Sequence, residues 1–264
     1  MDELQMEIPC IRTFNESMIE IDASHMETRE LNNLLREIML CGYEKVVLRN
    51  VCGQRYIGTR LYSPQRRVMT IEIYGTPGND LGAFLFGHRI LVHGNAQDGV
   101  GNTMESGEIV INGRAGDVTG MSMRGGRIFV KGDVSYRAAL HMKEHGLKKP
   151  VIVVGGTSQD FLGEYMAGGI VILLGLYRAH TARFIGSGMH GGAIYIRGEV
   201  GEEQVDSSVL ISRPDESDME ILGDCISDFI ERFPDLSLDM DYVLEGDWTK
   251  LSPRSSRPYG KLYA

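Results

Sequence analysis

The sequence is poor in cysteine and in long apolar runs, and each shortage excludes a class of protein. No two of the four cysteines, Cys10, Cys41, Cys52 and Cys225, are spaced as metal ligands, and nothing indicates a disulfide framework. We expect buried or half-buried thiols in a reducing cytosol. Because the apolar stretches are no longer than a strand and the N-terminus has no basic region, neither a membrane span nor a signal peptide is predicted. A cytoplasmic location is therefore expected.

Basic charge is also in short supply. The 264-residue chain has a formal net charge of -9, and residues 202–241 hold 13 acidic and 2 basic side chains. Residues 1–201 are balanced, with 21 of each sign. Because nucleic-acid binding needs a basic surface, no nucleic-acid partner is expected. The acidic segment is interpreted as either a solvated helix face or a docking surface for a basic partner.

Sequence motifs of common catalytic sites are missing as well. The chain has no GxxxxGK[ST] phosphate loop and no GxSxG nucleophile elbow. His141 and His145 flank Glu144, but the order is not HExxH, and a solvated insertion helix is the favoured interpretation. The intervals between strands are too short for a dinucleotide-binding βαβ unit. No catalytic, cofactor-binding or metal-ligating residue is predicted in this chain.

Glycine, by contrast, is abundant, with 33 residues, and it is periodic. Seven short strands read apolar-x-apolar-x-Gly and close on Gly75, Gly94, Gly113, Gly132, Gly156, Gly175 and Gly198. The steps between these glycines are 19, 19, 19, 24, 19 and 23 residues. Self-similarity at a fixed interval is typical of a solenoid, in which each repeat stacks on the last. We therefore predict a mainly β protein built as a parallel β-helix of about seven turns.

Alternation along each predicted strand separates an inner from an outer face. The pairs expected to form two inward ladders are Ile71/Ile73, Ile90/Val92, Ile109/Ile111, Ile128/Val130, Ile152/Val154, Val171/Leu173 and Ile194/Ile196. Glycines seven residues after the closing ones, and others six before the next, are expected to supply positive φ at sharp corners and to allow close approach of neighbouring coils.

The outward strand centres are unexpectedly apolar. After Glu72 they are Leu91, Val110, Phe129, Val153, Ile172 and Tyr195. Because an uncovered sheet face alternates to polar residues, this stripe is predicted to be an interface. It is covered either by the cap and tail of the same chain or by another subunit, which includes a second copy of this chain.

Three regions follow from these patterns. Residues 1–69 form a small α/β cap, with a helix from an N-capping Thr28 to about Cys41, ended by Gly42, and strands at 45–49 and 56–61. Residues 70–201 form the β-helix, with insertions around 136–150, expected to be a short helix, and around 176–185. Residues 202–264 form an acidic helix, with a capping box of Ser217 and Glu220, and an extended arm at 247–251 and 257–259.

Residues 156–175, which include the run GEYMAGG at 163–169, and residues 186–192 closely resemble the C-terminal GXGXG domain of the glutamate synthase large subunit. Residues 21–32 and 53–59 resemble the lead-in of stand-alone versions of that domain. The resemblance covers roughly residues 20–201 and implies a right-handed parallel β-helix. It also implies a non-catalytic scaffold subunit that organises a glutamine amidotransferase and an FMN-dependent synthase in glutamate biosynthesis and nitrogen assimilation, with FMN and iron–sulfur clusters on those partner subunits.

Other interpretations remain open. The formylmethanofuran dehydrogenase C subunit has the same repeat, although in more regular form, and would also be a scaffold. A free-standing enzyme would place its site in the groove near Glu164, Tyr165 and His190. A structural homo-oligomer would pair the outer stripes of two copies.

Overall fold

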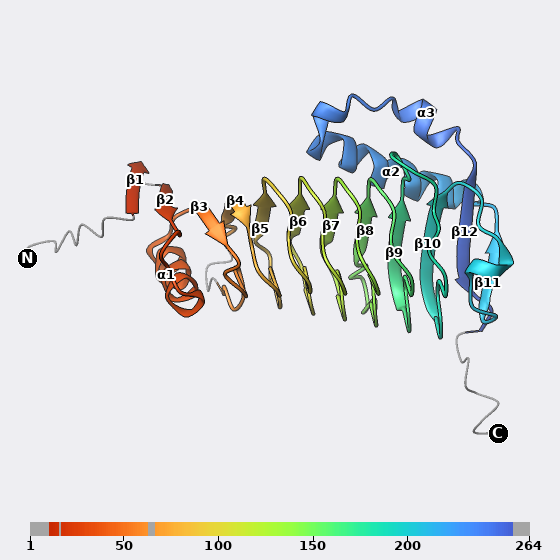
Figure 1. Cartoon of the computed structure of the whole chain (residues 1–264), viewed down its shortest axis with the longest axis horizontal. Coiled ribbons are helices and arrows are strands. Elements are labelled where there is room, and N and C mark those ends of the chain that lie inside the picture. Colours follow the sequence, from red (N-terminus) through yellow and green to blue (C-terminus); the bar gives the residue numbers. More distant parts are fainter. Residues whose placement is uncertain (1–10, 16, 63–66, 256–264) are drawn as a thin grey trace, which may run out of the picture.

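The computed structural model describes residues 11–15, 17–62 and 67–255, and they form one continuous sheet flanked by helices (Figure 1). The strands are β1 Ile11–Asn15, β2 Met18–Asp22, β3 Lys45–Cys52, β4 Thr70–Thr76, β5 Arg89–Val92, β6 Glu108–Ile111, β7 Arg127–Val130, β8 Val151–Val154, β9 Ala167–Leu173, β10 Gly191–Arg197, β11 Val209–Ser212 and β12 Trp248–Pro253. The helices are α1 Thr28–Cys41, α2 Glu216–Arg232 and α3 Met240–Leu244, with short 3₁₀ turns at Glu202–Gln204 and Pro234–Leu236.

The predicted parallel β-helix is confirmed. Eight successive parallel pairings join β2 to β10, and the register places Ile109 between Ile90 and Ile128. All fourteen residues of the two predicted inward ladders are buried. The parallel stack begins at β2, so it extends into residues that the sequence analysis assigned to the cap.

A column of methionines completes the inside of the β-helix. Met104, Met123, Met142, Met166 and Met189 recur with the repeat, and each is fully buried. Flexible thioether side chains fill irregular space well. The sequence analysis did not use this column, although its steps of 19, 19, 24 and 23 residues show the same basic interval and the same two long repeats as the glycines.

Helix α1 covers the N-terminal end of the core. It begins at Thr28 and ends before Gly42, which has φ 92°, as predicted. The capping prediction is wrong, because Glu27 is the N-cap residue and the Thr28 hydroxyl accepts a hydrogen bond of 3.2 Å from the backbone N–H of Arg55. The strand predicted at 56–61 is also wrong, because residues 56–60 turn a corner of the coil through Gly58, at φ 85°.

The insertion at 136–150 contains no helix. Arg137, Ala139 and His141 have positive φ, which an α-helix does not accept, and the backbones of His145 and Lys148 pair in an antiparallel bridge. The two histidines therefore do not share a helical face. The second insertion, 176–185, is also irregular.

The C-terminal tail returns across the β-helix and closes its end. Helix α2 is capped by Asp215 and Asp218 rather than by the predicted Ser217 and Glu220, and each aspartate accepts a backbone hydrogen bond of 2.9 Å from the other. The predicted arm at 247–251 is confirmed as part of β12, which pairs antiparallel with β10. The rest of the arm, at 257–259, lies outside the described residues. Among the residues that the structure describes, no helix is both long and apolar enough to cross a bilayer.

Candidate functional site

The strand-closing glycines serve two different purposes. Gly75, Gly175 and Gly198 have positive φ of 124°, 58° and 124°, as expected for corners. Gly94, Gly113, Gly132 and Gly156 do not, and they are required instead by close approach of adjacent coils. A Cβ at Gly132, for example, would lie 2.9 Å from the carbonyl oxygen of Gly113. The four middle glycines therefore leave a column of bare backbone along one corner of the β-helix.

The outer apolar stripe is covered by the chain's own tail, which was one of the two alternatives. Val110, Phe129, Val153, Ile172 and Tyr195 are buried, and they share a second apolar core with Leu222, Cys225, Ile226, Phe229, Phe233, Val243 and Trp248. Leu91 is only partly buried against it. Five of the six residues therefore form an interface within the chain, and Leu91 at the edge of the stripe is left partly uncovered.

The length of α2 explains where this coverage stops. Tyr195 of β10 contacts Asp218 near the start of the helix, and Glu108 of β6 contacts Arg232 at its end. Fourteen helical residues span roughly 21 Å, and four strand spacings span roughly 19 Å. The helix thus crosses the sheet from β10 to β6, and Leu91 on β5 lies beyond its end.

A buried carboxylate fixes the N-terminal end of α2. Asp218 accepts a hydrogen bond of 2.7 Å from the Tyr195 hydroxyl and two, of 2.8 and 2.7 Å, from Lys250 Nζ. Burial raises the pKa of Asp218, but the Lys250 and Tyr195 hydrogen bonds outweigh it, so its pKa is lowered. Burial, together with the adjacent carboxylate, raises the pKa of Tyr195.

Beyond the helix, the outer face carries a charged cluster centred on Glu72. Its carboxylate accepts a hydrogen bond of 2.9 Å from the Tyr74 hydroxyl, lies 2.6 Å from His93 Nε2 and pairs with Lys45. Burial opposes ionisation, yet these three partners lower the pKa of Glu72 to about 2. A carboxylate so strongly ionised is a poor proton acceptor at neutral pH. The cluster therefore has a structural role, because it links β3, β4 and the residue after β5 where the apolar stripe ends.

The cysteines differ from the prediction of buried or half-buried thiols. Cys41 and Cys52 are exposed, because they lie at the end of α1 and at the end of β3, whereas Cys225 is buried under α2. Cys10 lies outside the described residues. Within the described part of the chain, no group of three or more His, Cys, Asp or Glu side chains is placed to hold a metal ion.

The residues of the free-standing enzyme interpretation have other partners. Glu164 pairs with Arg137, the Tyr165 ring stacks on His141 at 5.2 Å, and His190 Nδ1 lies 3.2 Å from the Gly188 carbonyl oxygen. These contacts give no arrangement of nucleophile and base.

The same part of the β-helix carries a set of aromatic rings that are stacked and partly exposed. Phe161 and Phe184 stack at 4.9 Å, and the Arg137 guanidinium lies 4.5 Å from the Phe161 centroid. Tyr165 is 38% and Phe184 52% exposed. We name Arg137, His141, Phe161, Tyr165 and Phe184 the aromatic patch, and it coincides with the GEYMAGG segment and its neighbouring coils.

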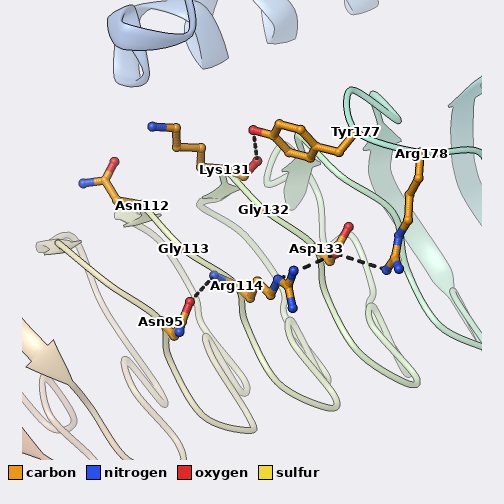
Figure 2. A pocket seen from close by; sticks show the side chains of 9 residues that line it. All are labelled: Asn95, Asn112, Gly113, Arg114, Lys131, Gly132, Asp133, Tyr177 and Arg178. Carbon is orange, nitrogen blue, oxygen red and sulfur yellow. Dashed lines mark hydrogen bonds and ion pairs between the residues drawn. The ribbon is translucent and has the colours of Figure 1, made fainter.

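A second surface feature lies along the bare glycine column and is shown in Figure 2. This corner groove has a volume of about 410 Å³. It is lined by Asn95, Asn112, Gly113, Arg114, Lys131, Gly132, Asp133, Tyr177 and Arg178. Tyr177 and Arg178 belong to the second insertion, so the irregular repeat forms one end of the groove. Sequence analysis missed it, because its residues come from four different coils.

Three comparisons relate the chain to known proteins. The profile of the family described as GXGXG motif matches residues 16–250. The uncharacterized protein MJ1350 of Methanocaldococcus jannaschii is 52% identical over 254 residues, which cover 93% of this chain and 96% of that protein. A chain in the crystal structure of the formyltransferase/hydrolase complex FhcABCD from Methylorubrum extorquens, in complex with methylofuran, has a TM-score of 0.55. That alignment covers 90% of this chain and 91% of that chain at 15% identity, which shows a shared fold.

Proposed function

The chain belongs to the GXGXG motif family, and from this membership we propose that it is a non-catalytic scaffold subunit of a glutamate synthase-type complex. It would hold a glutamine amidotransferase against an FMN-dependent synthase, and those partners would carry the catalytic residues, FMN and iron–sulfur clusters. The reaction served would be transfer of the glutamine amide nitrogen to 2-oxoglutarate.

The aromatic patch is the observation that carries this proposal. The apolar stripe on the outer face is already occupied by α2, whereas the stacked rings of Phe161 and Phe184 remain accessible. Aromatic and arginine side chains are the residue types most enriched at energetically important protein interfaces. Because the patch includes Tyr165 of the GEYMAGG run, the segment that carries the resemblance is also the segment available for a partner.

The rigidity of the β-helix suits this role. Its two inward ladders and its methionine column are fully buried and continuous from coil to coil. A stack of this kind presents surface residues at fixed distances along its length. A subunit that keeps two enzymes in register needs that property and needs no active site of its own.

A second candidate is a scaffold subunit similar to the formylmethanofuran dehydrogenase C subunit. It is favoured by the structural likeness to a chain of the formyltransferase/hydrolase complex over 90% of this sequence. The two insertions and the GEYMAGG run favour the glutamate synthase assignment instead.

Affinity purification of the tagged full chain from native extract, followed by mass spectrometry, tests the proposal. We expect a glutaminase-type amidotransferase and a flavin-dependent synthase in stoichiometric amounts. Recovery of formyltransferase and hydrolase subunits would favour the second candidate. Recovery of the chain without a stoichiometric partner at low salt would contradict both.

A further inference from the structure

The corner groove has an excess of positive charge within an acidic protein. Arg114, Lys131 and Arg178 line it, and Asp133 is the one acidic residue among the lining side chains. The Lys131 ammonium group pairs with Asp235 outside the lining, so the excess charge comes from the two arginines. The chain as a whole has a net charge of -9. A concave surface lined by one sign of charge concentrates ions of the opposite sign. The lining therefore favours a negatively charged occupant.

Both oxygens of the Asp133 carboxylate already have partners. Asp133 Oδ1 accepts hydrogen bonds of 2.8 and 3.3 Å from the backbone N–H and hydroxyl of Thr157. Its Oδ2 lies 3.1 Å from Arg178 Nη2 and 3.8 Å from Arg114 Nε. One carboxylate thus positions two guanidinium groups from opposite sides (Figure 2) but neutralises only one of the two charges.

The guanidinium of Arg114 is available for a ligand. Its side chain is 75% exposed, whereas Asp133 opposite is only 15% exposed. Guanidinium groups bind carboxylates and phosphates through paired, charge-assisted hydrogen bonds. Asn95 lines the groove beside Arg114, and its Oδ1 accepts a hydrogen bond of 2.9 Å from the Arg114 backbone N–H. The side-chain NH₂ group of Asn95 therefore keeps two N–H donors for a ligand.

The floor and the end of the groove keep these groups in place. Gly113 and Gly132 form the floor, and a Cβ at Gly132 would lie 3.0 Å from Arg114 Cγ. At the end, the Tyr177 hydroxyl donates a hydrogen bond of 3.2 Å to the Lys131 carbonyl oxygen, and Arg178 Nε donates one of 3.2 Å to the Thr157 hydroxyl. The second insertion therefore closes a groove that a regular repeat would leave open.

We propose that the corner groove binds a small oxyanion, namely the carboxylate or phosphate group of a soluble metabolite. Two guanidinium groups and neutral amide donors around a single satisfied carboxylate are the chemistry that such a group requires. A volume of about 410 Å³ accommodates a small molecule. This inference does not depend on the proposed scaffold function.

Isothermal titration calorimetry on the full chain tests this site with three probes. Glutarate carries two carboxylates, pyrophosphate carries phosphate groups, and glutaramide has the size of glutarate without its charge. We expect at least one of the two anions to bind and glutaramide not to bind. The tighter anion identifies the carboxylate or the phosphate as the natural group. Absence of binding by both anions at millimolar concentration would overturn the proposal.

Two variants change the site in opposite directions. Arg114→Gln removes an exposed guanidinium and is expected to weaken anion binding about tenfold. Asp133→Asn keeps an oxygen that can accept the Thr157 hydrogen bonds but removes the competing charge, so tighter binding is expected. Arg124→Gln is the matched control, since Arg124 is 56% exposed and does not line the groove. Unchanged affinity in Arg114→Gln, with an unchanged melting temperature, would also overturn the proposal.

Discussion

The hydroxyl oxygen of Tyr195 lies 2.7 Å from Oδ1 of Asp218, and this hydrogen bond ties the outer face of the β-helix to the first turn of α2. Lys250 of β12 contacts both oxygens of the same carboxylate. Asp218 is only 4% exposed. A single buried side chain thus joins β10, α2 and β12, three segments that are far apart in the sequence.

This arrangement predicts a large effect for Asp218→Ala. The substitution removes the partner of Lys250 and Tyr195 and also breaks the capping box with Asp215. We expect the free energy of unfolding to fall by about 2–4 kcal/mol. Urea denaturation followed by circular dichroism measures it. Tyr195→Phe, which removes one hydroxyl, should cost about 1 kcal/mol, and equal losses in both variants would contradict this account.

The charged cluster predicts a defined pH dependence. The pKa of Glu72 falls from 4.5 to about 2 on folding, so the folded state favours the ionised carboxylate. Its contribution to stability is therefore fully present above pH 4.5 and is lost as the pH falls toward 2. Glu72→Gln should flatten the loss of stability across this interval in thermal melts at stepped pH. The same slope in wild type and variant would show that other groups cause the acid dependence.

A different prediction concerns the aromatic patch. If it is the partner surface, Phe184→Ser should reduce recovery of the partner subunits in affinity purification at least about fivefold. Phe184 is 52% exposed, so its replacement should leave the melting temperature nearly unchanged. Tyr242→Ser is the control, since Tyr242 is 69% exposed, lies on α3 and does not belong to the aromatic patch. Equal recovery with both variants would exclude the patch as the interface.

The repeat made most of the fold predictable. Spacing alone predicted the seven strands within residues 70–201 and their register, because aliphatic residues such as Ile109 and Ile128 fill one buried column only if the coils align. Helix caps were less predictable, since Asp215 and Ser217 are both capping residue types and tertiary contacts to Asp218 decide between them. The insertion at 136–150 has an apolar composition compatible with a helix, but its backbone continues the corner of the coil. The corner groove was not predictable, because Asn95 and Arg178 come together only after several coils have stacked.

The last predictions concern the glycines that lie seven residues after the strand-closing glycines. Gly101 has φ 67°, and a Cβ there would lie 2.5 Å from Cδ1 of Ile128 on the strand of the next coil. Gly101→Ala should therefore combine backbone strain with overpacking and lower the free energy of unfolding by about 2–4 kcal/mol. Gly87→Ala is a matched control, because Gly87 has φ 79° but a Cβ there would meet no atom within 4 Å. It isolates the strain, at about 1–2 kcal/mol.

One coil of this chain has a Cβ at the corner and a smaller side chain on the facing strand, which makes room for it. Gly120 faces Ile152 and Gly163 faces Ile194, and the coil between them has Ala139, at φ 61°, with Val171 at the facing position. Valine lacks the Cδ1 atom with which a new Cβ would collide. Gly101→Ala combined with Ile128→Val should therefore be more stable than the sum of the single losses by about 1–2 kcal/mol in a double-mutant cycle. Strict additivity, measured by urea denaturation, would show that backbone strain alone makes glycine necessary at these corners.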